Sequence, residues 1–332
     1  MQMSHRCKIV GAALTAAVAV TLAACGSSSK SSSTSTTKAQ STAAAPGVAG
    51  GTPTPASSGP GVGKPPVTLG DKNFTEEFIL GNLYSQALAA KGYKVTLKGN
   101  IGTSEITWKA LTSGQIQMYP EYTGTLLTAI AGDNKPPTSA QQTYSLAKAY
   151  VEKHGFTLLN QTPFFDSDAL AATKAYAATH HLTTVADLKK LGHSLKLGGA
   201  PEFATRYAGL IGLKQAYGLN PTFVPLAIGI TYKAIDTGQV DVFDAFTTDA
   251  QLTSGKYVLL SDPKRVFGYQ NVAPVVKKSV LAAEGPAFAQ TIDKVSALLT
   301  LAAIRKMNAA VALDQQAPAK VAHDFLAANG LV

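Results

Sequence analysis

The hydrophobic and polar positions after residue 66 follow two different periods. Val67-Thr68-Leu69 is a short apolar run typical of a strand, and residues 95–97 are another. Between them, apolar residues recur at helical spacing, at Ile79, Leu80, Leu83, Tyr84, Ala87 and Leu88. Thr75 can cap this helix, acidic residues in its first turn favour the positive helix end, and Gly92 ends the run. The pattern predicts a strand, a helix and a second strand.

The same alternation continues along the chain. It predicts a helix over residues 105–113, a strand over 116–119 and a helix that begins near Tyr122 or Thr123. After Tyr269, it predicts a strand over 272–276 and helices over 288–305, 307–314 and 318–328. Strands that alternate with helices are typical of an α/β fold with a parallel sheet.

Part of this pattern occurs twice. Residues 108–123 align without gaps on residues 232–247, at an offset of 124. Both stretches read aromatic-Lys-Ala-aliphatic, then Gly-Gln-aliphatic, then two aromatic positions, and a second match pairs Leu69-Gly70 with Leu197-Gly198. Two such matches predict two related lobes that face each other across a cleft. Tyr122 and Phe246 then hold equivalent positions on opposite walls.

The first residues differ in composition from the rest. Arg6 and Lys8 precede an apolar run over 9–20, and Leu22-Ala23-Ala24-Cys25 fits the pattern in which the cysteine is lipidated after cleavage. This predicts a signal peptide over 1–24; the alternative is that Cys25 is merely a cysteine near a signal. The apolar run is too short for a permanent transmembrane helix. From 25 to 65 the chain is rich in Ser, Thr, Ala, Gly and Pro without acidic residues, which predicts a disordered tether.

Charge and reactive residues narrow the possible functions. The net charge is +9, but residues 1–64 hold five Lys and Arg and no acidic residue, so the remaining chain is near +4 and shows no basic stripe for nucleic acid. The histidines are scattered without metal-ligand spacing, and there is no G-x-S-x-G motif. We therefore expect no metal, no cofactor and no enzyme. The enzymatic alternative would use Asp166 and Asp168 as an acid and base pair.

Four segments carry a resemblance to a known family, in the order GDKNFTEEFILGNLY, QMYPEYTGTLL, PEFATRYAGLIGLKQAYGL and YKAIDTGQVDVFDAFTTD. They resemble the substrate-binding proteins of ABC importers for glycine betaine, carnitine and choline. The resemblance implies a two-lobed periplasmic-binding-protein fold of type II. Lobe I would comprise residues 66–165 and 271–332, lobe II residues 166–270, and the crossings near Asp166 and Tyr269 would form the hinge.

The resemblance also implies a ligand site between the lobes. A carboxylate would be held by Lys72, the hydroxyl of Thr125 and Arg206, and Asn73 belongs to the same turn as the lysine. Ring faces suit a quaternary ammonium because it has no N–H donors. The expected ring positions are Tyr122, Phe246 and Tyr269, with Phe246 where the family usually has tyrosine. The tyrosines could instead be ordinary wall residues, the lysine a solvated one and Arg206 a surface ion pair.

Two departures from the pattern of this family leave the identity of the ligand open. Asp168 stands where another cage aromatic is usual, and Glu77 replaces a usual glutamine. Asp168 could meet the cation directly, or bind a hydroxyl or ring N–H of a larger ligand such as a histidine betaine or an aromatic compound. Asp166 and Asp168 could equally serve the hinge.

The resulting hypothesis is a monomeric solute-binding lipoprotein, anchored through Cys25 to the outer face of the cell membrane. It would capture a zwitterionic quaternary ammonium compound and deliver it to a permease driven by a cytoplasmic ATPase. A sensory or adhesive lipoprotein is the competing class.

Overall fold

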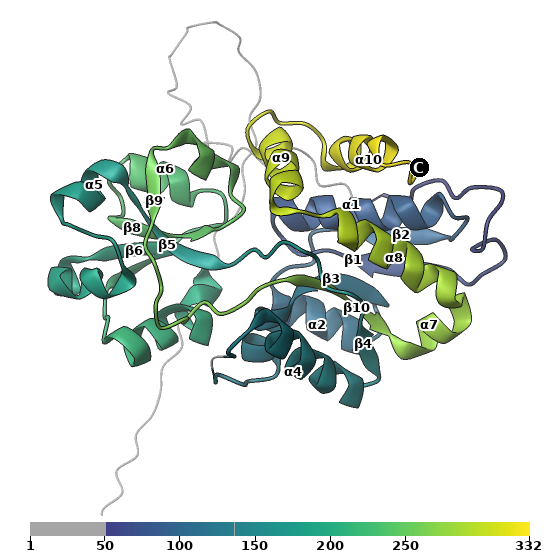
Figure 1. Cartoon of the computed structure of the whole chain (residues 1–332), viewed down its shortest axis with the longest axis horizontal. Helices are drawn as coiled ribbons and strands as arrows, with labels where there is room; N and C mark the ends of the chain where they lie inside the picture. The colour runs from purple at the N-terminus through teal and green to yellow at the C-terminus, as the bar shows by residue number, and fades with distance from the viewer. Residues whose placement is uncertain (1–50, 136) are drawn as a thin grey trace, which may run out of the picture. The chain divides into compact units, whose positions relative to one another are not determined.

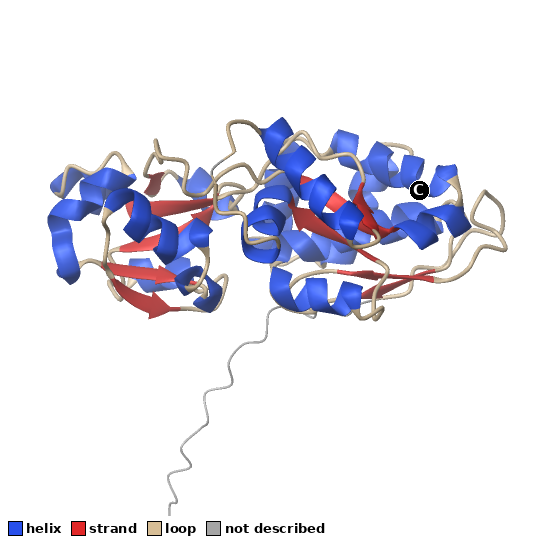
Figure 2. Ribbon diagram, turned by 90° about the horizontal axis from the view of Figure 1, so that it is seen from below, coloured by secondary structure: helices blue, strands red, loops and turns tan. Residues whose placement is uncertain are grey.

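The structure, a computed structural model, describes residues 51–135 and 137–332. The predicted signal peptide, Cys25 and the first part of the predicted tether lie outside these residues. The described residues form two five-stranded sheets, each flanked by helices (Figures 1 and 2). The prediction of an α/β fold is confirmed.

The first sheet, which defines lobe I, has the strand order β2-β1-β3-β10-β4. Its strands are β1 Val67–Gly70, β2 Val95–Lys98, β3 Met118–Tyr122, β4 Phe156–Leu158 and β10 Val272–Lys277. β1 is parallel to β2 and β3, whereas β10 runs antiparallel to β3 and β4. The sheet is therefore mixed rather than fully parallel, because β10 returns from lobe II.

The helices of lobe I are α1 Thr75–Ala89, α2 Ser104–Thr112, α3 Thr123–Thr125 with the wider turn Leu126–Ile130, α4 Ala140–Lys153, α7 Lys278–Glu284, α8 Pro286–Leu298, α9 Leu301–Ala312 and α10 Pro318–Ala328. Helix α1 is buried along most of its length, with Ile79, Leu80 and Leu83 fully buried in the main core of the lobe. Core residues of α8, α9 and α10 belong to the same cluster, so the C-terminal helices stabilise the lobe that the N-terminal strands begin.

The second sheet, which defines lobe II, has the order β7-β6-β8-β5-β9. Its strands are β5 Asp168–Thr173, β6 Lys196–Gly199, β7 Thr222–Pro225, β8 Val242–Phe246 and β9 Tyr257–Leu259. Its helices are α5 Lys174–Thr179 and α6 Thr231–Asp236, with shorter or wider helical segments at Val185–Ser194, Pro201–Ala204, Tyr207–Ile211, Leu213–Tyr217 and Ala250–Ser254.

The two lobes repeat one topology. In each, the fourth strand in the order is antiparallel to both of its neighbours, and that strand is the first strand after the chain crosses from the other lobe. β8 begins and ends 124 positions after β3, and β6 occupies in lobe II the place that β1 has in lobe I. The internal repeat predicted from the sequence is confirmed at the level of strands.

The two crossing segments lie against each other (Figure 1). Phe165 and Asn271 form an isolated antiparallel bridge, and the Asp166 N–H donates to the Gln270 carbonyl oxygen at 3.1 Å. Gly124 permits this crossing to pass close to α3, because a Cβ there would lie 2.6 Å from the Tyr269 carbonyl oxygen. The crossings therefore approach the start of the helix that follows β3.

The prediction of one helix over 288–305 is wrong. The chain leaves helical geometry at Leu299, and the Thr300 hydroxyl accepts from the Ala303 N–H to begin α9. The two helices meet at 87°. No single helix in 51–135 or 137–332 is long and apolar enough to cross a membrane; α8 and α9 pass that test only as a bent pair.

Residues 51–65 were predicted to belong to the tether, but they pack on lobe I. The Ala56 N–H donates to the Ala89 carbonyl at 2.8 Å, and the Gly61 N–H to the Lys91 carbonyl at 2.9 Å. Lys64 Nζ reaches the Ala283 carbonyl at 2.9 Å. The acceptors of these bonds are backbone carbonyls at or just after the end of α1 and within α7, so the hydrophobic pattern does not predict the bonds.

Candidate functional site

The structure brings eight of the nine predicted ligand-binding residues to one cavity of about 50 Å³, called here the small cavity. They come from the turn between β1 and α1, from the end of β3 and the start of α3, and from lobe II. The eight are Lys72, Asn73, Tyr122, Thr125, Asp166, Asp168, Arg206 and Phe246. Tyr122 and Phe246, the last residues of β3 and β8, face the cavity from opposite lobes as the repeat predicts.

The ninth residue, Tyr269, lines a separate cavity. Its hydroxyl donates to the Thr138 carbonyl at 3.0 Å, and the Arg265 guanidinium lies 5.9 Å from its ring centroid. Gln270, the next residue, lines both that cavity and the small one. Gln270 Oε1 accepts from the backbone N–H of Thr125 at 2.8 Å and from its hydroxyl at 3.2 Å.

Lys72 is buried and already paired with carboxylates. Its Nζ donates to Glu121 Oε1 at 2.6 Å and lies 3.7 Å from Glu77 Oε1. The same ammonium lies 4.2 Å from the centroid of the Tyr122 ring, within cation–π range. Burial raises the pKa of Glu77, although the Lys72 charge lowers it. The positive charge of Lys72 is therefore balanced by protein groups before any ligand enters.

Arg206 binds a carboxylate across the cleft. Its Nε donates to Glu105 Oε1 at 2.9 Å and its Nη2 to Glu105 Oε2 at 2.8 Å, the two-pronged geometry that suits guanidinium and carboxylate. Glu105 lies on α2 of lobe I, so this ion pair joins the lobes. Burial tends to raise the pKa of Glu105, but the hydrogen bonds and charge of Arg206 lower it to about 2.

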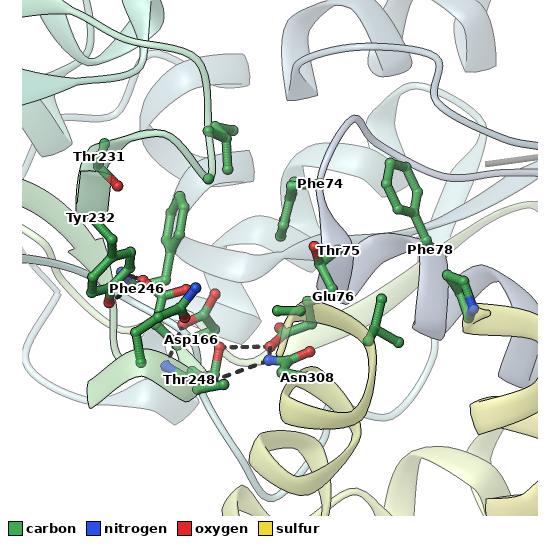
Figure 3. Close-up of a pocket in the computed structure, with 18 of the residues that line it drawn as sticks. Phe74, Thr75, Glu76, Phe78, Asp166, Thr231, Tyr232, Phe246, Thr248 and Asn308 are labelled. Carbon is green, nitrogen blue, oxygen red and sulfur yellow. Dashed lines mark hydrogen bonds between the residues drawn. The ribbon is translucent and has the colours of Figure 1, made fainter. Parts of the chain in front are cut away.

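Three aromatic rings form one wall, defined here as the three-ring wall. Phe74 stacks on Phe246 with ring centroids 5.8 Å apart at 14°, and lies 5.9 Å from Tyr122. Sequence reasoning missed Phe74, although it stands in the middle of the turn that carries the resemblance. Its extended backbone just before α1 points the ring toward lobe II (Figure 3).

Glu76 is a second residue that the prediction missed. Its carboxylate accepts a hydrogen bond from the Tyr122 hydroxyl at 2.7 Å. It also accepts hydrogen bonds from the Thr248 hydroxyl at 2.6 Å and from Asn308 Nδ2 at 2.9 Å (Figure 3). Burial raises its pKa, and these hydrogen bonds lower it in part. Thr248 belongs to lobe II, so Glu76 is a buried link between the lobes. In the sequence it looked only like a favourable acid in a first helical turn.

The lobe II wall is rich in carboxyl groups. Asp166 Oδ1 accepts from the Thr248 N–H at 3.0 Å, and burial raises the Asp166 pKa well above its usual range. Burial likewise raises the pKa of Asp168 to about 6, although the Arg206 charge opposes this. The pKa of Asp244 is also raised well above its usual range, first by burial and then by the charge of the neighbouring Asp168. This wall therefore favours a positively charged group.

A second cavity of about 240 Å³, called here the large cavity, adjoins the small one (Figure 3). It lies between lobe II and the N-terminal ends of α1 and α10 with part of α9. The residues that line both cavities are Phe74, Asp166, Ile228 and Phe246. The small cavity is the narrower of the two, at about 50 Å³.

Comparisons with known proteins agree with this architecture. Residues 65–328 match the family described as the substrate binding domain of ABC-type glycine betaine transport system. The chain belongs to this family. A member from Pseudomonas aeruginosa, the glycine-betaine-binding protein, is 33% identical over 276 residues, covering 80% of this chain and 88% of the relative. The glycine betaine-binding protein YehZ of Escherichia coli is 32% identical over 278 residues, covering 80% and 91%.

Solved structures of family members share the fold. One described as a glycine betaine/carnitine/choline ABC transporter matches with a TM-score of 0.65 and 26% identity, covering 80% of this chain and 99% of that chain. Apo YehZ from Escherichia coli matches with a TM-score of 0.59 and 31% identity over 80% and 99%. The two-lobed type II binding-protein fold predicted from the resemblance is confirmed.

Proposed function

We propose that this family member captures a quaternary ammonium zwitterion, glycine betaine or a related osmoprotectant, between its lobes and delivers it to an ABC permease driven by an ATPase. The main support is that the three-ring wall and Arg206 line the same small cavity. Rings attract a methylated cation, and Arg206 already holds a carboxylate there. This role is binding rather than catalysis, and we propose a monomer at the outer face of the membrane.

The proposal assigns the two ends of the ligand to different residues. Arg206, Thr125 and Asn73 face the carboxylate, whereas Phe74, Tyr122 and Phe246 face the methylated nitrogen. Lys72 contributes positive potential, but it does so as part of its network with Glu121 and Glu77. Tyr269 is not assigned to the cationic end, because this residue lines another cavity.

Isothermal calorimetry with glycine betaine tests this assignment. We expect Arg206→Ala to cost on the order of 2–5 kcal/mol, because a desolvated carboxylate loses its partner, and Tyr122→Ala about 1–2 kcal/mol. Tyr269→Ala is the matched control, since it removes an equal ring from outside the small cavity. Parent-like affinity in both Arg206→Ala and Tyr122→Ala would place the ligand elsewhere.

A further inference from the structure

The large cavity presents hydrogen-bond acceptors and negative charge. Its carboxyl groups are Glu76, Asp166, Asp244 and Asp249, and its lining includes no Lys, Arg or His among the described residues. Three of the donors on its wall are already engaged. The Tyr232 hydroxyl donates to Asp249 at 2.8 Å, and the Thr248 hydroxyl and Asn308 Nδ2 both donate to Glu76.

Two buried acceptor atoms in this lining have no protein partner. Oδ1 of Asn308 and Oδ1 of Asp244 receive no hydrogen bond from the described part of the chain, although each residue is only 6% exposed. An acceptor that is buried without a donor costs free energy, and a guest that donates to it would recover that cost. Asn308 belongs to α9 in lobe I and Asp244 to β8 in lobe II, so the two acceptors come from opposite walls.

A quaternary ammonium cannot fill this role, because its nitrogen has no hydrogen to donate. The guest must carry a hydrogen-bond donor, O–H or N–H, and because the surrounding carboxyls favour positive charge, a charged N–H group suits the site best. Phe74, Asp166 and Phe246 line both cavities, so a single molecule can reach from one to the other. Burial and then the charge of Asp168 raise the pKa of Asp244, and the charge of Arg206 lowers it only in part, so a further positive group beside Asp244 is favoured.

We propose that the large cavity is a second subsite, which takes an N–H-bearing nitrogen base, an amine or a protonated nitrogen heterocycle, from the same ligand whose methylated nitrogen lies at the three-ring wall. For the methylated end, this inference rests on the proposed function. For the N–H end, it rests on Asp244, Asn308 and the acceptor-rich lining alone.

Three probes separate the two parts by calorimetry. Glycine betaine has only the methylated zwitterion, histamine has only N–H-bearing nitrogens, and histidine betaine has both. We expect histidine betaine to bind the parent at least about tenfold more tightly than glycine betaine, the factor typical of one hydrogen bond to a charged group. Asp244→Asn should remove most of this advantage while changing glycine betaine affinity far less.

Asp244→Asn has nearly the same shape as the parent residue, and its thermal midpoint checks that it folds. Asp324 carries an exposed carboxyl group on α10, so Asp324→Asn is the control for the loss of one negative charge. Asn308 is not substituted, because its amide also joins the lobes.

The possible outcomes test the second subsite and the proposed function separately. If histidine betaine binds no more tightly than glycine betaine, or if its advantage survives Asp244→Asn, the subsite is overturned while the proposed function stands. If histamine binds and loses affinity in Asp244→Asn while glycine betaine does not bind, the N–H subsite stands and the quaternary ammonium function falls. If none of the probes binds, both are overturned.

Discussion

At the scale of single residues, Glu105 does what a ligand carboxylate is expected to do. It holds Arg206 through two short hydrogen bonds, and its lowered pKa keeps it charged at neutral pH. A carboxylate-bearing ligand that needs Arg206 must therefore displace Glu105 or share the guanidinium with it. Glu105 is 41% exposed in its side chain, so the pair is partly screened by water and can be exchanged at modest cost.

This competition predicts that Glu105→Gln tightens glycine betaine binding by about two- to fivefold, the range that a partly exposed ion pair supplies. Choline carries the same methylated nitrogen without a carboxylate, so its affinity should hardly change. Calorimetry with both compounds makes the measurement. Weaker binding of both compounds would mean instead that the ion pair serves to hold the lobes together.

At the scale of elements, α9 connects the C-terminal helices of lobe I to lobe II. Arg305 Nη2 donates to the Thr247 carbonyl at 2.6 Å and its Nε to the same oxygen at 3.2 Å. Asn308 Nδ2 donates to the Thr248 carbonyl at 3.2 Å as well as to Glu76. The chain turns by 87° between α8 and α9, and it is α9 that carries these contacts to lobe II.

Arg305→Leu should therefore loosen the lobes without unfolding either of them. A hydrogen bond from a charged donor contributes about 1.5–3 kcal/mol, enough to shift the opening equilibrium roughly ten- to a hundredfold. We expect a larger radius of gyration for the unliganded variant in small-angle X-ray scattering. Lys306→Ala, an exposed neighbour on α9, is the control. The α9 contacts would be irrelevant to closure if both variants scattered like the parent.

The elements that the sequence predicts well are those with strong local signals. The bounds of α10 agree with the predicted 318–328, since a proline begins the helix and Gly330 takes up a left-handed turn just beyond it. The break between α8 and α9 was missed because apolar residues continue through Leu299, which is itself fully buried. Hydrophobic spacing reports burial, and burial does not reveal a change of helix direction.

The residues of the candidate site also differ in how well the sequence predicts their positions. Residues next to strand ends, such as Tyr122 and Phe246, could be placed from the repeat because topology fixes where strands end. Which way Tyr269 points depends on pairing between the two crossing segments, which no local pattern encodes. The engagement of Lys72 by Glu121 is likewise a contact between distant segments. Ligand contact by the eight residues of the small cavity remains a prediction.

At the scale of the whole molecule, lobe I is joined to the proposed anchor by the segment before β1. Residues 51–65 lie on lobe I, so the tether of the folded protein would end near residue 50 rather than 65. That shortens the predicted reach between Cys25 and the folded part by about 15 residues, or at most about 50 Å of extended chain. The permease would have to be met within this reach.

Replacing the proposed anchor tests this arrangement. Cys25→Ser should release the protein from the membrane fraction or leave an uncleaved precursor, because no thiol remains to carry lipid. Fractionation followed by mass measurement of the mature N-terminus gives the readout. Normal processing with unchanged membrane association would show that the protein is held there by something other than lipid on Cys25.

Asn308 contributes both to the contact between the two lobes and to the lining of the large cavity, so it links the closing of the lobes to the binding of a guest. Its amide nitrogen donates both to Glu76 and to the Thr248 carbonyl of lobe II, while its Oδ1 accepts no hydrogen bond from residues 51–135 or 137–332. If a guest at that oxygen steadies the amide, it favours the joined lobes, and by thermodynamic reciprocity the joined lobes favour the guest by the same factor. A permease that pulled the lobes apart would then lower the affinity for the ligand in the same step. Release of the ligand would then need no separate signal, because the opening of the lobes itself weakens the binding of the ligand.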